Sequence, residues 1–96
     1  MPEENLTLYD RMLVYGRVQM VLFRDSACRR ARKMGLAGYV KNLPDGSVEI
    51  IAKGGHEKVL ELFEWAKHGP IFARVERHLI EKISLPENFN DFSIKY

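Results

Sequence analysis

The sequence predicts a two-layer α+β domain in which two helices cover one face of an antiparallel sheet. Short runs of alternating apolar and polar residues indicate strands with one buried face, and two longer segments with apolar residues at three-to-four spacing indicate amphipathic helices. Glycine and proline separate these segments into the order strand, helix, strand, strand, helix, strand, with a short strand at the end. The 96 residues provide for one domain with one modest core.

The first strand is predicted over residues 9–15, after a polar lead-in over residues 1–8. Residues 9–15 alternate and are rich in aromatic and aliphatic side chains, which is typical of a strand, and Gly16 follows them. We therefore expect a single domain over residues 9–96.

The first helix follows a loop that opens at Gly16. Its apolar residues fall on one helical face and are Phe23, Ala27, Ala31 and Met34. The basic residues of this segment lie elsewhere on the helix and are Arg29, Arg30, Arg32 and Lys33. Gly35 is the expected stop signal.

A hairpin comes next, with strands over residues 37–42 and 47–53. The connection between them, residues 43–46, reads Leu-Pro-Asp-Gly, and its proline and Asp-Gly pair favour a tight turn. Gly54 and Gly55 end the second strand.

The second helix is predicted over residues 56–67, before Gly69 and Pro70 interrupt the pattern. The apolar residues that we expect on its buried face are Val59, Leu60, Phe63 and Ala66. Strands over residues 73–84 and 92–96 complete the chain. This order corresponds to a ferredoxin-like βαββαβ sandwich with an extra short C-terminal strand. Because that fold hosts many activities, function has to be inferred from the site.

Composition excludes several classes of protein. A net charge of +2 suits an anionic ligand but is too small to indicate nucleic acid, and no apolar run approaches the roughly 18 residues that span a bilayer. The first ten residues lack an apolar signal region, so we expect a soluble cytoplasmic protein with no membrane partner. Without a coiled-coil seam, a monomer is the expected state.

We expect neither a metal nor a cofactor. His56, His68 and His78 show no metal-ligand spacing. Cys28 is the single cysteine, and it is more often a small packed residue than a nucleophile when no histidine partner is evident.

The segment from Gly16 to Arg24 joins the first strand to the first helix and suits an anion. A tight loop can turn several backbone N–H groups toward one point, where the helix N-terminus adds partial positive charge. The guanidinium of Arg24 can hold two phosphate oxygens at once. An ordinary strand-to-helix turn with a solvated arginine is the alternative interpretation of these residues alone.

Two motifs make the interpretation more specific. Residues 14–24, Val-Tyr-Gly-Arg-Val-Gln-Met-Val-Leu-Phe-Arg, resemble the first acylphosphatase signature, from which only Met20 departs, since the family usually has glycine there. Residues 38–48, followed by Gly54, resemble the second signature. Gly69-Pro70, residues 73–75 and residues 92–94 are also similar to the family, so the resemblance extends from the first strand to the C-terminus.

The resemblance implies a metal-free enzyme that hydrolyses a small acyl phosphate to a carboxylate and inorganic phosphate. Arg24 and Asn42 would be the catalytic residues, with Asn42 orienting the attacking water. The residues that would bind the phosphate are Arg17, Val18, Gln19, Met20, Val21 and Arg24. Attack at phosphorus is expected, because an anion-binding pocket stabilises the charge of the phosphoryl group.

The methionine at position 20 leaves open whether the loop can bind phosphate as a glycine-containing loop would. Where the backbone must be left-handed, a residue other than glycine costs roughly 1–2 kcal/mol and can turn an amide away from the phosphate. A weakly active or non-catalytic phosphate-binding domain is therefore one alternative function.

RNA binding is the alternative from a different class, because RNA-recognition domains have a related topology and the first helix is basic. The aromatic sheet motif that stacks bases is absent, so a solvated helix face is the preferred interpretation and no nucleic acid is expected. Asn42 also has a structural alternative, a bond to the hairpin backbone.

Overall fold

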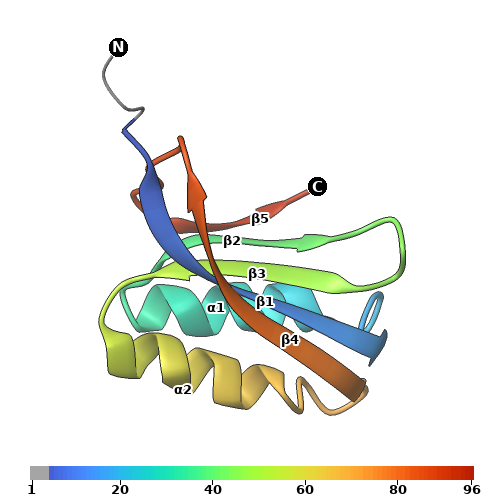
Figure 1. Cartoon of the computed structure of the whole chain (residues 1–96). Helices are drawn as coiled ribbons and strands as arrows, with labels where there is room; N and C mark the ends of the chain where they lie inside the picture. Colours follow the sequence, from blue (N-terminus) through green and yellow to red (C-terminus); the bar gives the residue numbers. More distant parts are fainter. Residues whose placement is uncertain (1–4) are drawn as a thin grey trace.

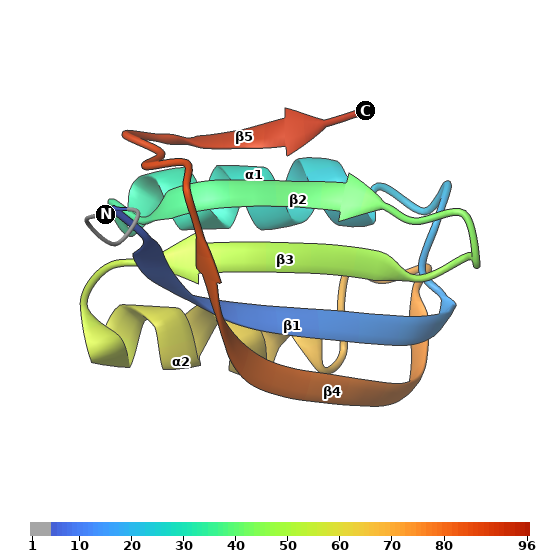
Figure 2. The same cartoon turned by 45° about the horizontal axis from the view of Figure 1, so that its top comes forward.

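The computed structural model describes residues 5–96 and has the predicted ferredoxin-like order with a fifth strand (Figure 1). The elements are β1 (Thr7–Arg17), α1 (Phe23–Lys33), β2 (Ala37–Asn42), β3 (Val48–Lys53), α2 (His56–Ala66), β4 (Arg74–Leu85) and β5 (Phe92–Lys95). The strands form one sheet in the order β4-β1-β3-β2-β5, and both helices lie against the same face (Figure 2). The predicted fold class is confirmed.

Strand β1 is longer than the alternation predicts, because it pairs with β4 from Thr7 opposite Leu85 to Arg17 opposite Arg74. A bulge at Tyr15 and Gly16 shifts the register and lets the pairing continue. Of the predicted lead-in, residues 7 and 8 belong to β1 and residues 1–4 lie outside the described residues. The pairing with β4 therefore brings the chain directly to the start of the loop before α1.

The fifth strand differs from the others in direction. In the order β4-β1-β3-β2 each strand is antiparallel to its neighbour, as predicted, whereas β5 pairs parallel to β2, with Gly38 opposite Phe92. The connection between β4 and β5 covers Tyr9, whose hydroxyl donates to the Glu87 carbonyl at 2.8 Å and accepts from the Phe89 N–H at 3.0 Å. This connection returns the chain to the far edge of the sheet, beside β2.

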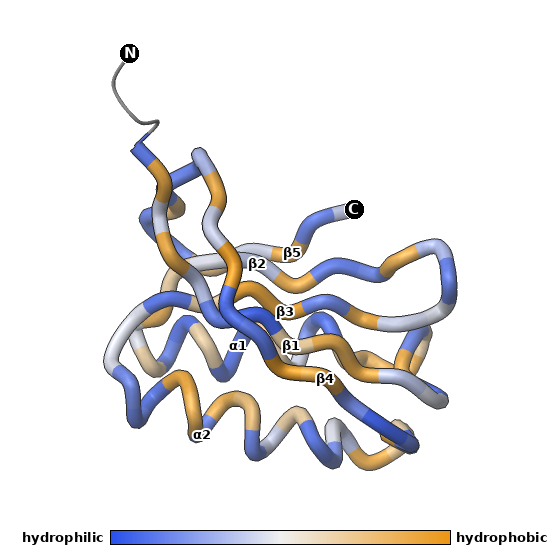
Figure 3. The backbone as a smooth tube through the Cα atoms, in the orientation of Figure 1, coloured by the Kyte–Doolittle hydropathy of each residue, from blue (hydrophilic) through white to orange (hydrophobic). Residues whose placement is uncertain are grey.

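The hydrophobic core lies between the sheet and the helices. Hydrophobic residues concentrate in the middle of β1 and β3, whereas the connection between β2 and β3 is largely hydrophilic (Figure 3). Helix α1 packs through Phe23, Ala27, Cys28 and Ala31. Burial of a large side chain such as Phe23 contributes roughly 1.5–3 kcal/mol, and the alanines let the helix approach the sheet closely.

One predicted core position on α2 is wrong. Leu60 is about half exposed, at 49%, and Leu62 is fully buried in its place. The apolar spacing allowed either residue, and the angle at which α2 packs on the sheet decides between them. No helix within residues 5–96 is long and apolar enough to cross a membrane.

Candidate active site

A cleft of about 400 Å³ opens at the end of the sheet where β2 ends and α1 begins. It is lined by Val18, Met20, Leu22, Phe23, Arg24, Asp25, Asn42, Ile94 and Tyr96. Strands β1 and β2 run in the same direction, since each is antiparallel to β3, so the loop after β1 and the turn after β2 lie at one end of the sandwich. This arrangement brings Arg24 and Asn42 to the same cleft.

The loop before α1 presents backbone N–H groups that the fold does not use. Within residues 5–96, no backbone carbonyl accepts a hydrogen bond from the amides of residues 19–22. Met20 and Leu22 have left-handed backbones, with φ of 62° and 65°, and Leu22 caps α1 without a side-chain hydrogen bond. Alternating backbone conformations of this kind turn successive N–H groups into an anion-binding concavity at a helix N-terminus.

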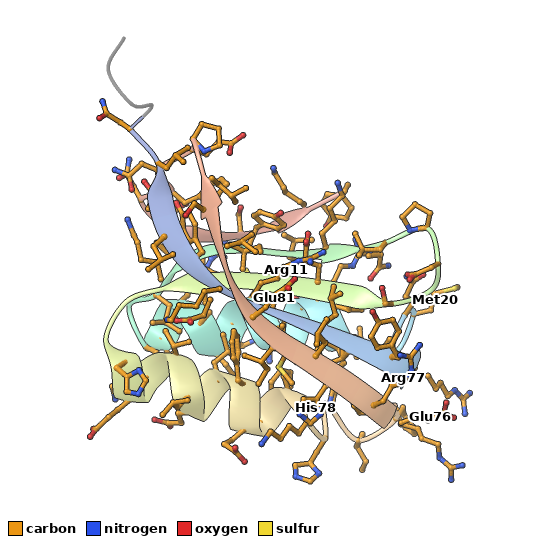
Figure 4. The ribbon with its side chains drawn as sticks, viewed as in Figure 1. Arg11, Met20, Glu76, Arg77, His78 and Glu81 are labelled. Carbon is orange, nitrogen blue, oxygen red and sulfur yellow. The ribbon has the colours of Figure 1, made fainter. Side chains whose placement is uncertain are left out.

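Met20 adopts the conformation that glycine would provide. Its φ of 62° is left-handed, at a cost of roughly 1–2 kcal/mol for a residue with a Cβ. Its side chain is 99% exposed and lies at the outer end of the loop, beside the connection between β2 and β3 (Figure 4). The methionine therefore strains the backbone, while its exposed side chain is one of those that line the cleft.

Arg24 lies in the first turn of α1 and is partly buried. Its guanidinium carbon is 4.8 Å from the centre of the Tyr96 ring, a stacking contact that holds the charged group at the cleft. Asp25, the acidic residue beside it, is paired with Arg29 one turn further along the helix. Within residues 5–96 Arg24 has no carboxylate partner, so its charge is available to an anion.

Asn42 is the last residue of β2 and sits opposite Val48 in the hairpin. Its Oδ1 atom is buried and has no hydrogen-bond partner among the described residues. Leaving a buried acceptor unpaired costs about 1–3 kcal/mol, so this oxygen can gain free energy from a donor brought into the cleft. The alternative interpretation is a side-chain bond from Asn42 to the hairpin backbone, but within residues 5–96 the Oδ1 atom accepts no such bond.

The side chains of the remaining predicted phosphate-binding residues are not available to a ligand in the cleft in the way that the Arg24 side chain is. Val18 and Val21 are buried, so only their backbone atoms can serve a ligand, and exposed Arg17 lies at the end of β1 outside the cleft lining. Gln19 uses its side chain in the fold: Nε2 donates to the Leu43 carbonyl at 2.9 Å and to the Ser47 carbonyl at 2.8 Å.

Sequence reasoning missed five lining residues, which are Leu22, Phe23, Asp25, Ile94 and Tyr96. The parallel pairing of Lys41 with Lys95 places Tyr96 beside Asn42, and only the register of β5 contains that information.

The features set aside at the sequence level have structural partners. Arg30 stacks on Trp65, with 4.7 Å from its guanidinium carbon to the ring centre, and Arg32 Nε donates to the Phe92 carbonyl at 2.8 Å. Cys28 is buried, and burial raises the pKa of its thiol. Residues 5–96 contain no group of three His, Cys, Asp or Glu side chains that could hold a metal ion.

Comparisons with known proteins agree with the resemblance. The acylphosphatase family model matches residues 10–94. The acylphosphatase of Methylococcus capsulatus is 43% identical over 83 residues, which cover 86% of this chain and 90% of that protein. The acylphosphatase of Thermococcus kodakarensis is 48% identical over 81 residues, covering 84% and 88% respectively. The crystal structure of acylphosphatase from Bacillus subtilis has a TM-score of 0.85 and 39% identity, covering 94% of this chain and 100% of that one.

Proposed function

The chain belongs to the acylphosphatase family, and we propose that it performs the family's reaction with Arg24, the amides of the loop after β1, and Asn42. The reaction is the hydrolysis of an acyl phosphate to a carboxylate and inorganic phosphate. One observation carries the assignment of residues: Arg24, which has no carboxylate partner among the described residues, and Asn42, whose amide oxygen is unpaired there, line the same cleft as the loop with unused N–H groups.

The phosphoryl group binds where the loop and α1 meet. Of the amides predicted to bind it, those of residues 19–21, which no backbone carbonyl within residues 5–96 uses, and that of Arg24 surround its oxygens, and the Arg24 side chain holds two of them in a charge-assisted fork. The first turn of α1 adds the partial positive charge of a helix N-terminus. These groups stabilise the charge on the phosphoryl oxygens as the bond to the leaving group lengthens, which is the main requirement of phosphoryl transfer.

Asn42 positions the water that attacks. A water that donates a hydrogen bond to the buried Oδ1 satisfies that atom and directs its own lone pair toward phosphorus. The amide is too weak a base to remove the proton, so the proton passes to an oxygen of the substrate's own phosphate.

Attack by the water forms one bond to phosphorus and breaks another. A new P–O bond forms to the water oxygen, and the bond between phosphorus and the acyl oxygen breaks. Its electron pair leaves on the carboxylate, which is stable as an anion and needs no acid to protonate it.

The test is hydrolysis of benzoyl phosphate, followed by absorbance in the presence of EDTA, by the wild type and two variants. Arg24→Ala is expected to lose both phosphate binding and turnover. Asn42→Ala is expected to retain inorganic phosphate as a competitive inhibitor while kcat falls roughly a hundredfold or more. Arg30→Ala, on the same helix, and Asn88→Ala, which loses one exposed hydrogen bond to Lys53, are the matched controls.

Wild-type activity no higher than spontaneous hydrolysis, from folded protein, would contradict the function. Full activity in Arg24→Ala or Asn42→Ala would instead contradict the role of that residue and leave the family reaction in place.

A further inference from the structure

Gln19 belongs to the loop whose amides are proposed to bind phosphate. Its side chain, however, forms hydrogen bonds with the turn that follows Asn42. Its Nε2 group donates to the carbonyls of Leu43 and Ser47, at 2.9 and 2.8 Å. These two carbonyls lie at the two ends of the turn that follows Asn42, and the Leu43 N–H also donates to the Ser47 carbonyl, at 2.9 Å. The side chain is partly buried, so water competes only weakly for these bonds.

The order of the strands makes this contact important. The phosphate loop follows β1 and Asn42 ends β2, but β3 lies between these two strands. No ladder of backbone hydrogen bonds therefore joins the two halves of the site directly. Among residues 5–96, the two bonds of Gln19 are the only side-chain hydrogen bonds between residues 18–22 and the β2–β3 connection.

We propose that Gln19 is a positioning residue that fixes Asn42, and the water it holds, relative to the phosphate bound by the loop. The inference rests on the proposed function. The carboxamide spans both ends of the turn, so it restrains the segment next to Asn42 without touching the substrate. In-line attack needs the water and the phosphorus in a defined geometry, and a displacement of about 1 Å can cost roughly a hundredfold in rate.

A change at Gln19 is expected to affect turnover and phosphate binding differently. Gln19→Met keeps an unbranched side chain of similar length but removes both donors, so the turn after Asn42 is released while the loop amides and Arg24 stay in place. We expect kcat for benzoyl phosphate to fall roughly tenfold to a hundredfold, with the inhibition constant of inorganic phosphate changed by less than about twofold.

A double-mutant cycle tests whether the effect passes through Asn42. In an Asn42→Ala background the water is no longer positioned, so adding Gln19→Met is expected to change kcat by less than about twofold. Weaker phosphate binding in Gln19→Met, or the same loss of kcat in both backgrounds, would overturn the proposal, because Gln19 would then support the phosphate loop itself. A wild type without activity would contradict the proposed function. This outcome differs from those that would overturn the role of Gln19 alone.

The matched control is Tyr39→Phe, which removes a different side-chain hydrogen bond from β2, the 3.0 Å bond from Tyr39 to Glu49. Its kcat is expected to match the wild type, and a fall equal to that of Gln19→Met would overturn the proposal by making general loosening of β2 the cause. If thermal melting shows that Gln19→Met is unfolded, Gln19→Asn provides the same test, since its amide is one methylene too short to span both carbonyls.

Discussion

At the scale of single residues, Met20 occupies a backbone conformation that favours glycine. The backbone takes the left-handed conformation although methionine disfavours it, and the exposed side chain makes no packing contact that offsets the cost. The neighbouring Leu22 is left-handed as well. The strain at Met20 therefore reduces the stability of the fold.

Met20→Gly is expected to raise the free energy of unfolding by about 1 kcal/mol, because relief of the left-handed strain exceeds the extra chain entropy of glycine. Urea unfolding of the wild type and variant measures the difference. Met20→Ala is the control, since it removes the exposed side chain and keeps the strain, and it is expected to match the wild type. A gain in Met20→Ala as large as in Met20→Gly would show that the side chain, and not the backbone, causes the cost.

At the scale of elements, the start of α1 depends on packing rather than on a capping side chain. Leu22 provides no cap, and Phe23, the first helical residue, is held by the Trp65 ring, with 5.3 Å between ring centres. Gly69, after α2, allows this approach, because a Cβ there would lie 2.6 Å from Cε2 of Phe23. Since Arg24 follows Phe23, the packing of Phe23 against the connection after α2 influences the position of Arg24 at the start of α1.

Gly69→Ala and Gly35→Ala form a matched pair. Both glycines are left-handed, with φ of +75° and +72°, but a Cβ on Gly35 meets nothing within 4 Å. Gly35→Ala is expected to cost about 1 kcal/mol of unfolding free energy and to leave kcat unchanged, whereas Gly69→Ala should cost about 2–4 kcal/mol and lower kcat by displacing Phe23. Urea unfolding and benzoyl phosphate turnover measure both effects, and equal costs in the two variants would contradict the packing argument.

At the scale of the whole molecule, one polar network joins four neighbouring strands on the sheet face away from the helices. Arg11 on β1 donates to Glu49 on β3 at 2.8 Å and to Glu81 on β4 at 2.5 Å, and Tyr39 on β2 donates to Glu49 at 3.0 Å. Arg11 and Glu81 lie together over the middle of the sheet (Figure 4). Glu49 is only 8% exposed, so its charge depends on these partners.

The network predicts how stability changes at alkaline pH. Burial raises the pKa of the Tyr39 phenol above its ordinary value, and the Glu49 carboxylate raises it further. Because the folded state favours the neutral phenol, its contribution is complete below about pH 10 and is lost as the pH rises from there through the folded pKa.

We therefore expect Tyr39→Phe to be less stable than the wild type at neutral pH, where a hydrogen bond is lost, and to decline less steeply above about pH 10. Urea midpoints measured from neutral pH to about pH 11 check this. Parallel curves for the two proteins would show that Tyr39 does not contribute to the alkaline loss.

The sequence by itself determined the order of the elements and the residues to consider at the site. Alternation, helical spacing and the glycine and proline positions are local properties of the chain, so they predict elements to within about two residues. The motifs around Arg24 and Asn42 likewise lie in short stretches, and the resemblance they carry named the family that the comparisons show. The roles of those residues stay predictions until the variants are measured.

Only the tertiary structure decided which distant groups meet. The cleft shared by Arg24 and Asn42, the stacking of Tyr96 on Arg24 and the bonds from Gln19 to the turn each join residues of different elements. The burial of Leu62 instead of Leu60 depends on how α2 packs on the sheet. Such contacts are set by strand register and by the fit of helices against the sheet, and a local pattern along the chain contains neither.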